Sequence, residues 1–341
     1  MKLQNIFVFA SKIDRSEDRI MKITKSETYK VDLFEEPHAK SDHERNFTKT
    51  LTFTGSELIG AIISAGMPDV YLTKHEKRSR REEILFKIKL FETFVKSSSK
   101  GKLSFDTSRR AYLDSTEIGA INYWIGMVLI TVLGQKKYNY EFMVHLSMVK
   151  LFSEKIDTEK RPFVIKGKKV FKSPDLLAIN VLEKKYGVFE SKGYTDYNKK
   201  AMESGYTQAK SIKSINGYRP ENCLVVMTQT GGNEIRMIEK DPEGENVEIN
   251  IDLDFLYLYH FLPIAELITE LQPDEYEGRV SGYLEYDNNS YSISIPGTLY
   301  KELSRTIDSG VWNPDDSSIY ESLFDEASVA AKDREKILYV E

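Results

Sequence analysis

Residues 173–193 read SPDLLAINVLEKKYGVFESKG, a stretch with two short apolar runs on either side of a polar turn. The first run covers residues 175–181 and the second covers residues 186–192, and three charged residues at 183–185 separate them. Short apolar runs bounded by polar turn residues are typical of neighbouring strands. The sequence therefore predicts a β-hairpin at this point of the chain.

Charged residues gather at the open end of this hairpin. Asp175 begins the first strand, and the triplet Glu190-Ser191-Lys192 ends the second. Because side chains alternate along a strand, Glu190 and Lys192 face one side and Ser191 faces the other. Two carboxylates beside a backbone carbonyl form an oxygen site of the kind that Mg²⁺ prefers, and a neighbouring lysine can orient an attacking water. This arrangement suits metal-assisted hydrolysis of a phosphodiester.

The pair Pro174-Asp175, followed by Glu190-Ser191-Lys192, resembles the active-site motif of the PD-(D/E)XK nuclease superfamily, which has the restriction-endonuclease-like fold. Three other Pro-Asp pairs occur in the chain, but none has an acidic-x-Lys triplet at a hairpin's distance on a second apolar run. The resemblance implies an α/β core made of a helix, a three-stranded meander, a second helix and a further strand. It also implies a Mg²⁺-dependent DNA endonuclease in which Mn²⁺ can replace Mg²⁺.

The same resemblance assigns roles to the residues of the motif. Asp175 and Glu190 would hold the metal ion, and the main-chain carbonyl of Ser191 would complete the protein ligands. Lys192 would position the attacking water. Each residue also has an ordinary explanation, since an aspartate after proline is a common turn former and Glu-x-Lys on a strand is commonly an exposed ion pair.

The segments that flank the hairpin follow the order expected for such a core. Residues 115–134 predict a helix with a capping residue at its start. Residues 196–215 have apolar residues at helical spacing, and residues 222–228 form an apolar run typical of a buried strand. The resemblance covers residues 112–230 and does not extend to either end of the chain.

Three residues of the flanking helices are further site candidates. Glu117, in the first turn of the first helix, would extend the metal site, although an acidic residue there also complements the helix dipole without any function. In the second helix, Gln208 is similar to the glutamine that helps to position the superfamily's site. Lys210 is similar to the nearby basic residue that meets phosphate. Solvated helix faces carry such residues routinely.

Composition excludes several classes of protein. The single cysteine, Cys223, falls in a predicted buried strand, so the chain has neither a disulfide framework nor a cysteine-based zinc site, and a cytoplasmic location is expected. The five histidines have no pair at metal-ligand spacing, which leaves a His-dependent hydrolase unsupported. The N-terminal apolar run is too short for a signal peptide, and residues 118–134 are interpreted as a buried core helix rather than a membrane span.

Charge is distributed unevenly along the chain. Residues 241–341 hold 6 Lys and Arg against 23 Asp and Glu, whereas residues 1–240 hold 42 against 30. A basic body favours a polyanion such as DNA, because binding releases counterions. The residues that we expect to contact DNA are Lys77, Arg78, Arg80 and Arg81 in the densest basic cluster, and Lys199, Lys200 and Lys210 beside the predicted site.

The chain divides into three regions, and the first of them is an N-terminal accessory domain at residues 1–111. It has strand-like segments at 5–10, 28–33 and 47–53 and a more helical stretch at 82–95. The second region, residues 112–240, is the predicted nuclease core.

Residues 241–341 form the third region, an acidic C-terminal accessory domain. It shows alternating apolar positions at 247–253, an apolar helix pattern at 256–271 and a strand pattern at 291–295. Its aromatic and apolar content indicates a core or an interface rather than a disordered tail. We therefore expect it to dock a protein partner or to self-associate into a homo-oligomer rather than to mimic DNA.

The sequence favours Mg²⁺-dependent cleavage of DNA, and family resemblance suggests a role in bacterial or phage-related defence. Two alternatives stay open. One is a binding or structural module on the same fold that has lost catalysis. The other is a subunit of a larger assembly, silent until an ATPase, a helicase or a nucleotide second messenger engages it. The absence of a phosphate-binding G-x-x-x-x-G-K-[ST] motif means that any motor would be a partner.

Overall fold

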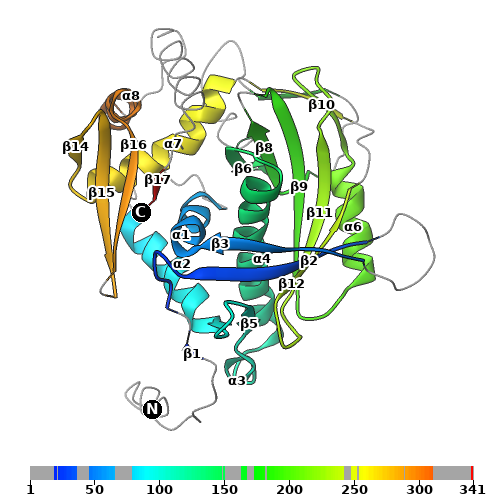
Figure 1. Cartoon of the computed structure of the whole chain (residues 1–341). Helices are drawn as coiled ribbons and strands as arrows, with labels where there is room; N and C mark the ends of the chain where they lie inside the picture. The colour runs from blue at the N-terminus through cyan, green and yellow to red at the C-terminus, as the bar shows by residue number, and fades with distance from the viewer. Residues whose placement is uncertain are drawn as a thin grey trace.

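A computed structural model gives the fold of the chain (Figure 1). The residues that it describes are 19–20, 22–36, 46–65, 79–147, 149, 163–166, 173–180, 183–241, 247–251, 253–287, 289–309 and 339–340. The architecture is mixed α/β, as the sequence predicts, and its centre is a seven-stranded sheet flanked by helices. The strand predicted at residues 5–10 lies outside the described residues.

The central sheet has the strand order β3-β2-β12-β11-β9-β8-β6. The strands are β2 (Thr28–Glu35), β3 (Asn46–Thr54), β6 (Phe142–His145), β8 (Leu176–Asn180), β9 (Lys185–Tyr194), β11 (Asn222–Gln229) and β12 (Arg236–Lys240). Two neighbouring pairs are parallel, β2 with β12 and β9 with β11, and the other four pairs are antiparallel. The predicted strands at 28–33, 47–53 and 222–228 are confirmed as β2, β3 and β11.

The predicted hairpin is confirmed as β8 and β9. These strands pair antiparallel from Asn180 opposite Lys185 to Leu176 opposite Phe189. Beyond Phe189, β9 continues to its end paired with β11 alone. Among the described strands, one edge of β9 therefore has no neighbour just where Asp175 precedes β8.

Two helices cover opposite faces of the sheet at this point. α4 (Ser115–Lys137) and α6 (Lys199–Ala209) both contact β9 and β11. Ser191 faces α4, whereas its neighbours Glu190 and Lys192 face α6. The alternation predicted for the triplet is therefore confirmed, and the helix predicted at 115–134 is confirmed as α4.

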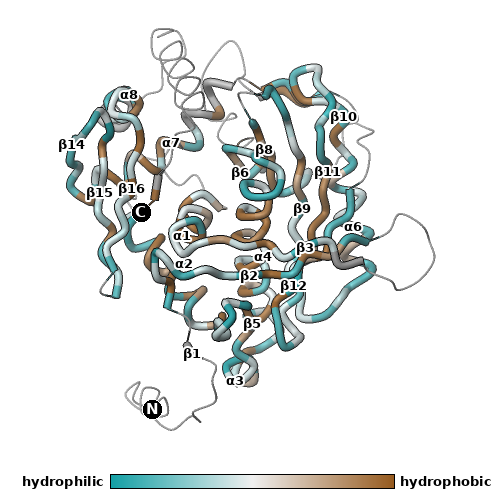
Figure 2. Tube along the Cα trace, in the orientation of Figure 1, coloured by the Kyte–Doolittle hydropathy of each residue, from teal (hydrophilic) through white to brown (hydrophobic). Residues whose placement is uncertain are grey.

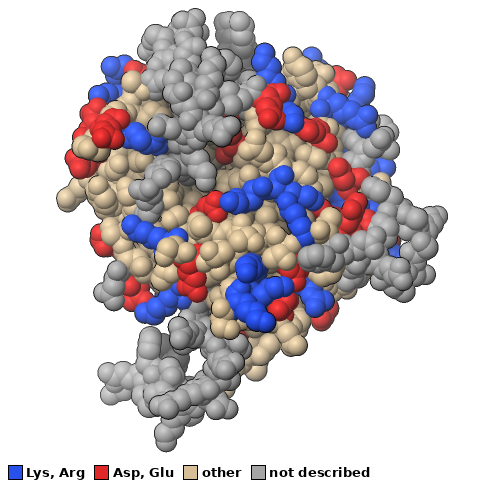
Figure 3. Space-filling view, in the orientation of Figure 1, with Lys and Arg blue, Asp and Glu red and all other residues tan. Residues whose placement is uncertain are grey.

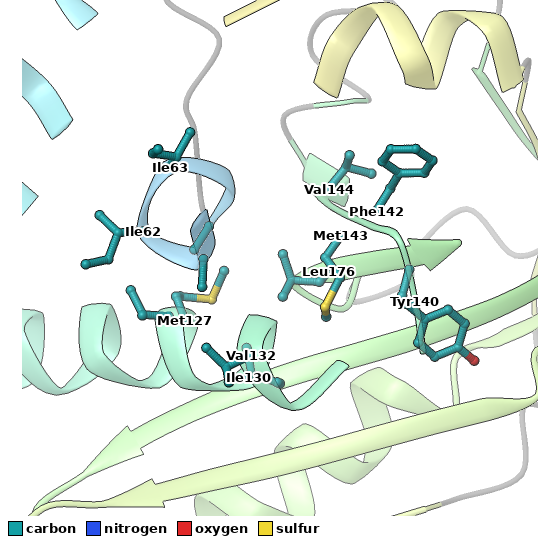
Figure 4. Packing of buried hydrophobic residues seen from close by; sticks show 14 of the residues in the cluster. Ile62, Ile63, Met127, Ile130, Val132, Tyr140, Phe142, Met143, Val144 and Leu176 are labelled. Atoms are coloured by element: carbon teal, nitrogen blue, oxygen red, sulfur yellow. The ribbon is translucent and has the colours of Figure 1, made fainter. Parts of the chain in front are cut away.

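The helix α4 passes through the main hydrophobic core. α1 (Gly55–Ser64) lies beside it, and side chains of α1, α4 and β6 interlock between the two helices and the sheet, as Figure 4 shows for Ile62, Met127 and Met143. By length and composition α4 could cross a membrane, but 67% of its most apolar window is buried inside the protein. Figure 2 shows the corresponding concentration of apolar residues on α4 and the inner strands.

The second predicted helix is shorter than expected. The helical pattern at 196–215 predicted one continuous helix, but α6 ends at Ala209 and β10 (Ile212–Ile215) follows it. β10 pairs parallel with β13 (Val247–Ile251), and the pairing contains a register shift between Ile212 and Ser214. This irregularity lets Ile212 and Ile215 both be buried although they are three residues apart. The helical spacing of Met202, Tyr206 and Ala209 is confirmed within α6, whereas Ile212, the fourth residue of the pattern, lies in the bulged strand.

The remaining elements complete three smaller sheets and the other helices. They are β1 (Arg19–Ile20), α2 (Arg80–Phe94), β4 (Val95–Ser97), β5 (Leu103–Phe105), α3 (Thr107–Arg110), β7 (Phe163–Lys166), α7 (Leu253–Glu270), β14 (Asp274–Tyr276), β15 (Arg279–Tyr286), β16 (Asn289–Pro296), α8 (Gly297–Ser309) and β17 (Tyr339–Val340). The helical stretch predicted at 82–95 is confirmed as α2. The C-terminal patterns at 247–253, 256–271 and 291–295 are confirmed as β13, α7 and β16.

The C-terminal sheet, β14-β15-β16-β17, stands at the side of α7 and α8 (Figure 1). It is joined to the N-terminal region through the buried carboxylate of Glu92 on α2. This carboxylate accepts the Ile23 backbone N–H at 2.9 Å and the Tyr286 hydroxyl, and the Tyr291 hydroxyl donates to the Ile23 carbonyl. The central sheet likewise crosses the predicted boundary at residue 111, since β2 and β3 belong to it. The three-region division stays a prediction.

A second junction links α7 to the N-terminus of α2. The carboxylate of Glu270 accepts the backbone N–H groups of Arg80 and Arg81 at 2.9 and 3.0 Å, and the Ser79 hydroxyl at 2.9 Å. The first backbone N–H groups of a helix have no partner within the helix, so an acceptor supplied from elsewhere stabilises this end. An acidic residue of the C-terminal region thus caps a helix that is distant in sequence.

Close packing of α4 against β9 fixes the position of the hairpin. A Cβ atom at Gly193 would lie 2.0 Å from the Asn122 carbonyl oxygen, and one at Gly126 would lie 3.0 Å from the Ser191 Oγ. Only glycine allows the backbones of α4 and β9 to approach this closely. At Gly119, by contrast, an added Cβ would meet nothing within 4 Å.

The contrast between these glycines is testable. Gly193→Ala should destabilise the protein by about 3 kcal/mol, because two packed backbones must separate. Gly119→Ala, at an exposed helical position on the same α4, should be neutral or stabilise by roughly 0.5–1 kcal/mol through helix propensity. Urea unfolding followed by circular dichroism gives both free energies. Equal effects of the two substitutions would contradict the packing described for Gly193.

Candidate active site

Asp175 and Glu190 are locked together across the open end of the hairpin. The carboxylate of Asp175 accepts the Ser191 backbone N–H at 2.8 Å, and the carboxylate of Glu190 accepts the Asp175 backbone N–H at 3.0 Å. Each acidic side chain therefore binds the backbone beside the other. The structure brings together the two carboxylates that the sequence predicts as partners.

Glu190 is buried, which disfavours the ionised form of its carboxyl group. Its side chain is 0% exposed, and burial raises its pKa to about 7, with the negative charge of Asp175 adding to the rise. Lys192 opposes this rise through an ion pair between its ammonium and the Glu190 Oε1. Perturbed carboxylates of this kind concentrate at functional sites, although structural ion-pair networks also perturb them.

Gln208 joins the cluster from α6. Its Oε1 accepts the Lys192 Nζ at 3.2 Å, and its Nε2 donates to the Ser173 carbonyl at 3.2 Å. The glutamine therefore ties the lysine to the segment that leads into Asp175. This confirms that Gln208 lies beside the motif, as its position in the second helix predicts.

A glycine brings α6 close enough for this contact. A Cβ atom at Gly205 would lie 2.6 Å from Val225, 3.1 Å from the Lys192 Cε and 3.3 Å from the Glu190 Cγ. The helix thus rests directly on the aliphatic parts of two site residues. The sequence analysis did not identify Gly205; the only signal was a glycine inside a helical pattern.

The donor atoms present suit a hard divalent cation. The N–H and C=O of a strand residue point to the same edge, so the Ser191 carbonyl lies on the edge where its N–H meets Asp175. Asp175, Glu190 and this carbonyl together offer oxygen atoms alone, which fits Mg²⁺ or Mn²⁺. When Glu190 is ionised, two carboxylates share one ammonium, and a bound cation would compensate the remaining negative charge. Within the described residues, no group of three or more His, Cys, Asp or Glu side chains is placed to hold a metal, so water or substrate would supply the other ligands.

Glu117 sits in a capping box at the start of α4. Its backbone N–H donates to the Asp114 carboxylate at 2.9 Å, and its own carboxylate accepts the Asp114 backbone N–H at 2.9 Å. The side chain is exposed, and its contacts in the structure are those of the capping box rather than contacts with Asp175 or Glu190. The capping box is sufficient to explain an acidic residue at this position. A role of Glu117 as a metal ligand stays a prediction.

Tyr123 and His145 approach the carboxylates, and the sequence analysis did not identify either. The Tyr123 hydroxyl lies 3.3 Å from the His145 Nε2. Burial raises the pKa of Tyr123 to about 12, with contributions from the charges of Asp175 and Glu190. His145 ends β6, and β6 was not predicted because four residues are too few to show a period.

The basic residues of the second predicted group lie on or next to α6. Lys199 and Lys200 are exposed in its first turn, and Lys210 caps its C-terminus with the ammonium 5.6 Å from the Tyr206 ring centre. Lys240 of β12 lies 5.1 Å from the same ring. This helix therefore carries positive charge at both ends, and Lys210 is two residues from Gln208.

The densest basic cluster is placed differently. Lys77 and Arg78 lie outside the described residues. Arg80 is 0% exposed and forms ion pairs with Glu83 at 3.0 Å and Glu266 at 3.5 Å, so its guanidinium is inside the protein rather than on a DNA-binding surface. Arg81 is more exposed and pairs with Glu82 at 3.1 Å.

No family model, curated protein or solved structure matches this chain.

The burial of Glu190 predicts a pH dependence of stability. The folded chain binds a proton at Glu190 up to about pH 7, whereas the ordinary pKa is 4.5, so the folded state binds more protons between these values. Stability should therefore fall as the pH rises through this window. Glu190→Gln removes this titration, so the stability of the variant relative to the wild type should rise by on the order of 3 kcal/mol between pH 4 and pH 8. Urea unfolding in EDTA across this range measures it, with Glu183→Gln in the solvated turn as the matched control. A difference in unfolding free energy between Glu190→Gln and the wild type that does not change with pH would contradict the raised pKa of Glu190.

Glu117 can be separated from the metal site by direct titration. Glu117→Gln keeps an acceptor in the capping box, so the free energy of unfolding should change by about 1 kcal/mol or less. Mn²⁺ binding measured by calorimetry should be unchanged in Glu117→Gln and weakened in Asp175→Asn. A marked loss of Mn²⁺ affinity in Glu117→Gln would instead make Glu117 a ligand.

Proposed function

We propose that this protein is a metal-dependent nuclease that hydrolyses phosphodiester bonds of DNA. The observation that carries the proposal is the convergence of Asp175, Glu190 and Lys192 at the unpaired edge of β9, with Gln208 bound to the lysine. Two carboxylates, an ammonium and an open strand edge form a site suited to a metal ion and a phosphate group. The proposal includes the PD-(D/E)XK resemblance of these residues.

The order of elements around the site supports this resemblance. Along the chain, the helix α4 precedes β6, β8 and β9, which are neighbours in the central sheet and pair antiparallel. Two strands of a separate sheet are inserted in this order, β7 between β6 and β8 and β10 between α6 and β11. The helix α6 and the strand β11 follow, and β11 lies parallel to β9. This is the order of helix, three-stranded meander, helix and strand that the resemblance implies. Assignment to the restriction-endonuclease-like fold is part of the proposal.

Asp175, Glu190 and the Ser191 carbonyl would hold Mg²⁺, for which Mn²⁺ would substitute. When bound, the metal would lower the pKa of a coordinated water and stabilise negative charge on the phosphate. The ion pair between Glu190 and Lys192 keeps the Glu190 side chain oriented for this role in a buried position.

Lys192 would orient the attacking water or hold a phosphate oxygen. Its ammonium is bound on one side by Glu190 and on the other by Gln208, which in turn is bound to the Ser173 carbonyl. An ammonium on a flexible side chain gains precision when it is restrained at both sides. Gln208 is therefore a positioning residue for Lys192.

The charge of the surroundings favours a nucleic acid as substrate. Lys199 and Lys200 are exposed on the helix that carries Gln208, and the first 240 residues have an excess of positive charge. In the orientation of Figure 3, Lys and Arg side chains gather in the middle of the face and acidic side chains gather over β14. We propose DNA as the polyanion and defence as the cellular role, both on the strength of the resemblance.

A structural role of the same residues is the second candidate. It is favoured by the reciprocal hydrogen bonds of Asp175 and Glu190, which would also serve to close the end of the hairpin. A regulated subunit remains a further possibility, with an ATPase or helicase bound to the acidic C-terminal region, where Tyr276 on β14 is 71% exposed. These alternatives differ from the nuclease in what Lys192 does.

The decisive experiment measures cleavage and stability in the same variants. Asp175→Ala and Lys192→Ala should each reduce Mg²⁺-dependent cleavage of duplex DNA by about 10²-fold or more, because each removes a ligand or an oriented charge. Lys185→Ala, at the solvated beginning of the same strand, is the matched control and should cleave at the wild-type rate. Cleavage is followed on labelled DNA, and the free energy of unfolding is measured for each variant.

Two outcomes would sink the proposal. If Lys192→Ala cleaved DNA at the wild-type rate, the assignment of these residues as the active site would be wrong. The structural role would be established instead by two results together. The wild type would not cleave DNA with either Mg²⁺ or Mn²⁺, and Asp175→Ala and Lys192→Ala would each lose much of their stability. Cleavage that begins only when a co-purified partner is added would identify the regulated subunit.

A further inference from the structure

A chain of three polar side chains borders the site on the side of α4. The Tyr123 hydroxyl lies 3.3 Å from the His145 Nε2, and the His145 Nδ1 lies 2.9 Å from the Ser147 Oγ. Tyr123 comes from α4, whereas His145 ends β6 and Ser147 follows it. Two elements that are distant from the hairpin in sequence thus supply hydroxyl and imidazole groups to one place.

This chain is held against the carboxylates by the sheet and by α4. His145 is opposite Leu176 in the β6–β8 pairing, and the backbone N–H of Leu146 donates to the Asp175 carbonyl at 2.9 Å. The residue before Tyr123 is Asn122, whose carbonyl packs against Gly193. The charges of Asp175 and Glu190 both act on the Tyr123 hydroxyl.

Tyr123 is also open to a ligand. Its side chain is 36% exposed, whereas Glu190 beside it is fully buried. Tyr123 belongs to α4, which packs on the face of the sheet that Ser191 faces, whereas Lys192 lies on the α6 face. A group bound between Asp175 and solvent could therefore be contacted from two sides.

We propose that Tyr123 contacts the phosphate group of the substrate through its phenolic O–H, and that His145 positions Tyr123 for this contact. The inference rests on the proposed nuclease function and adds to it a neutral donor opposite the ammonium of Lys192. It places a phenol, rather than the acid predicted at Glu117, as the contribution of α4 to the site.

The arrangement of hydrogen atoms follows from this role. The Ser147 hydroxyl donates to the His145 Nδ1, and the His145 Nε2–H donates to the Tyr123 oxygen, which leaves the phenolic hydrogen for a phosphate oxygen. Burial lowers the pKa of His145, against the opposing charge of Asp175, and this direction favours the neutral imidazole that the arrangement uses. A neutral phenol beside two carboxylates can approach phosphate without adding negative charge.

The first test compares Tyr123→Phe with Tyr218→Phe, an exposed tyrosine in the connection between β10 and β11. Steady-state cleavage and the affinity for a DNA duplex are measured, the latter in Ca²⁺. Removal of one hydrogen bond to a charged phosphate should lower kcat/KM about ten-fold in Tyr123→Phe, while Tyr218→Phe matches the wild type. Duplex affinity in Ca²⁺ should fall in the same variant.

The second test asks whether His145 acts through Tyr123. His145→Ala should lower kcat/KM to the level of Tyr123→Phe, and the double variant should be no worse, since both substitutions break one chain. His145→Gln keeps an N–H donor and should restore most of the lost activity. Nitrogen NMR of the imidazole should show the Nε2–H tautomer in the wild type and a shifted Nε2 signal in Tyr123→Phe.

The outcomes separate this inference from the proposed function. If the wild type cleaves DNA and Tyr123→Phe cleaves it equally well, the inference is overturned and the proposed nuclease function is not. Additive losses in the double variant, or an Nδ1–H tautomer, would overturn the role of His145. A wild type that never cleaves DNA would overturn the nuclease, and the phosphate contact with it.

Discussion

The close approach of α4 to β9 is the constraint on which the site depends. At Gly193 the two backbones leave no room for a side chain, because the carbonyl of Asn122 lies against it. The buried side-chain amide of the same Asn122 is bound by hydroxyl groups just beyond the ends of two strands. The Thr230 hydroxyl donates to the Asn122 Oδ1 at 2.8 Å, and the Asn122 Nδ2 donates to the Thr195 Oγ1 at 3.4 Å. These contacts fix α4 in both rotation and height on the sheet. Tyr123 is placed near the carboxylates by this fixed register, and the edge of β9 beyond Phe189 is left open because β8 begins only at Leu176.

The sequence specified the elements that bury continuous apolar surface. The hairpin, the helix beginning at Ser115 and the strand at 222–228 are predicted because their patterns arise from burial alone, and the Asp175–Glu190–Lys192 cluster follows from strand alternation. The end of α6 was not predictable, because Ile212 of the following strand is buried three residues after Ala209 and so continues the spacing of the helix. Tyr123 and His145 were not found because their proximity is a product of tertiary packing, and neither residue type is unusual in a helix or strand.

Charge was the least reliable guide. The basic cluster at 74–81 suggested a binding surface, yet Arg80 is buried between Glu83 and Glu266, and the helix that begins there is capped by Glu270. Part of the charge difference between the basic body and the acidic C-terminal region is therefore consumed within the molecule. Sequence counts cannot distinguish charges that are paired across the fold from charges that face solvent, because pairing depends on contacts between α2 and α7 that are distant in the chain.

The pairing of β2 with β12 sets the order in which the protein can fold as it is synthesised. β2 and β3 emerge from the ribosome early, but their sheet partner in the parallel direction, β12, is complete only after residue 240. Until then, one edge of β2 presents unpaired N–H and C=O groups, and such edges pair readily with other chains. Contacts between strands so far apart in sequence also slow folding. A nascent chain of this protein therefore carries an open strand edge through most of its translation, and binding of a chaperone to residues 28–35 would protect it until the sheet closes.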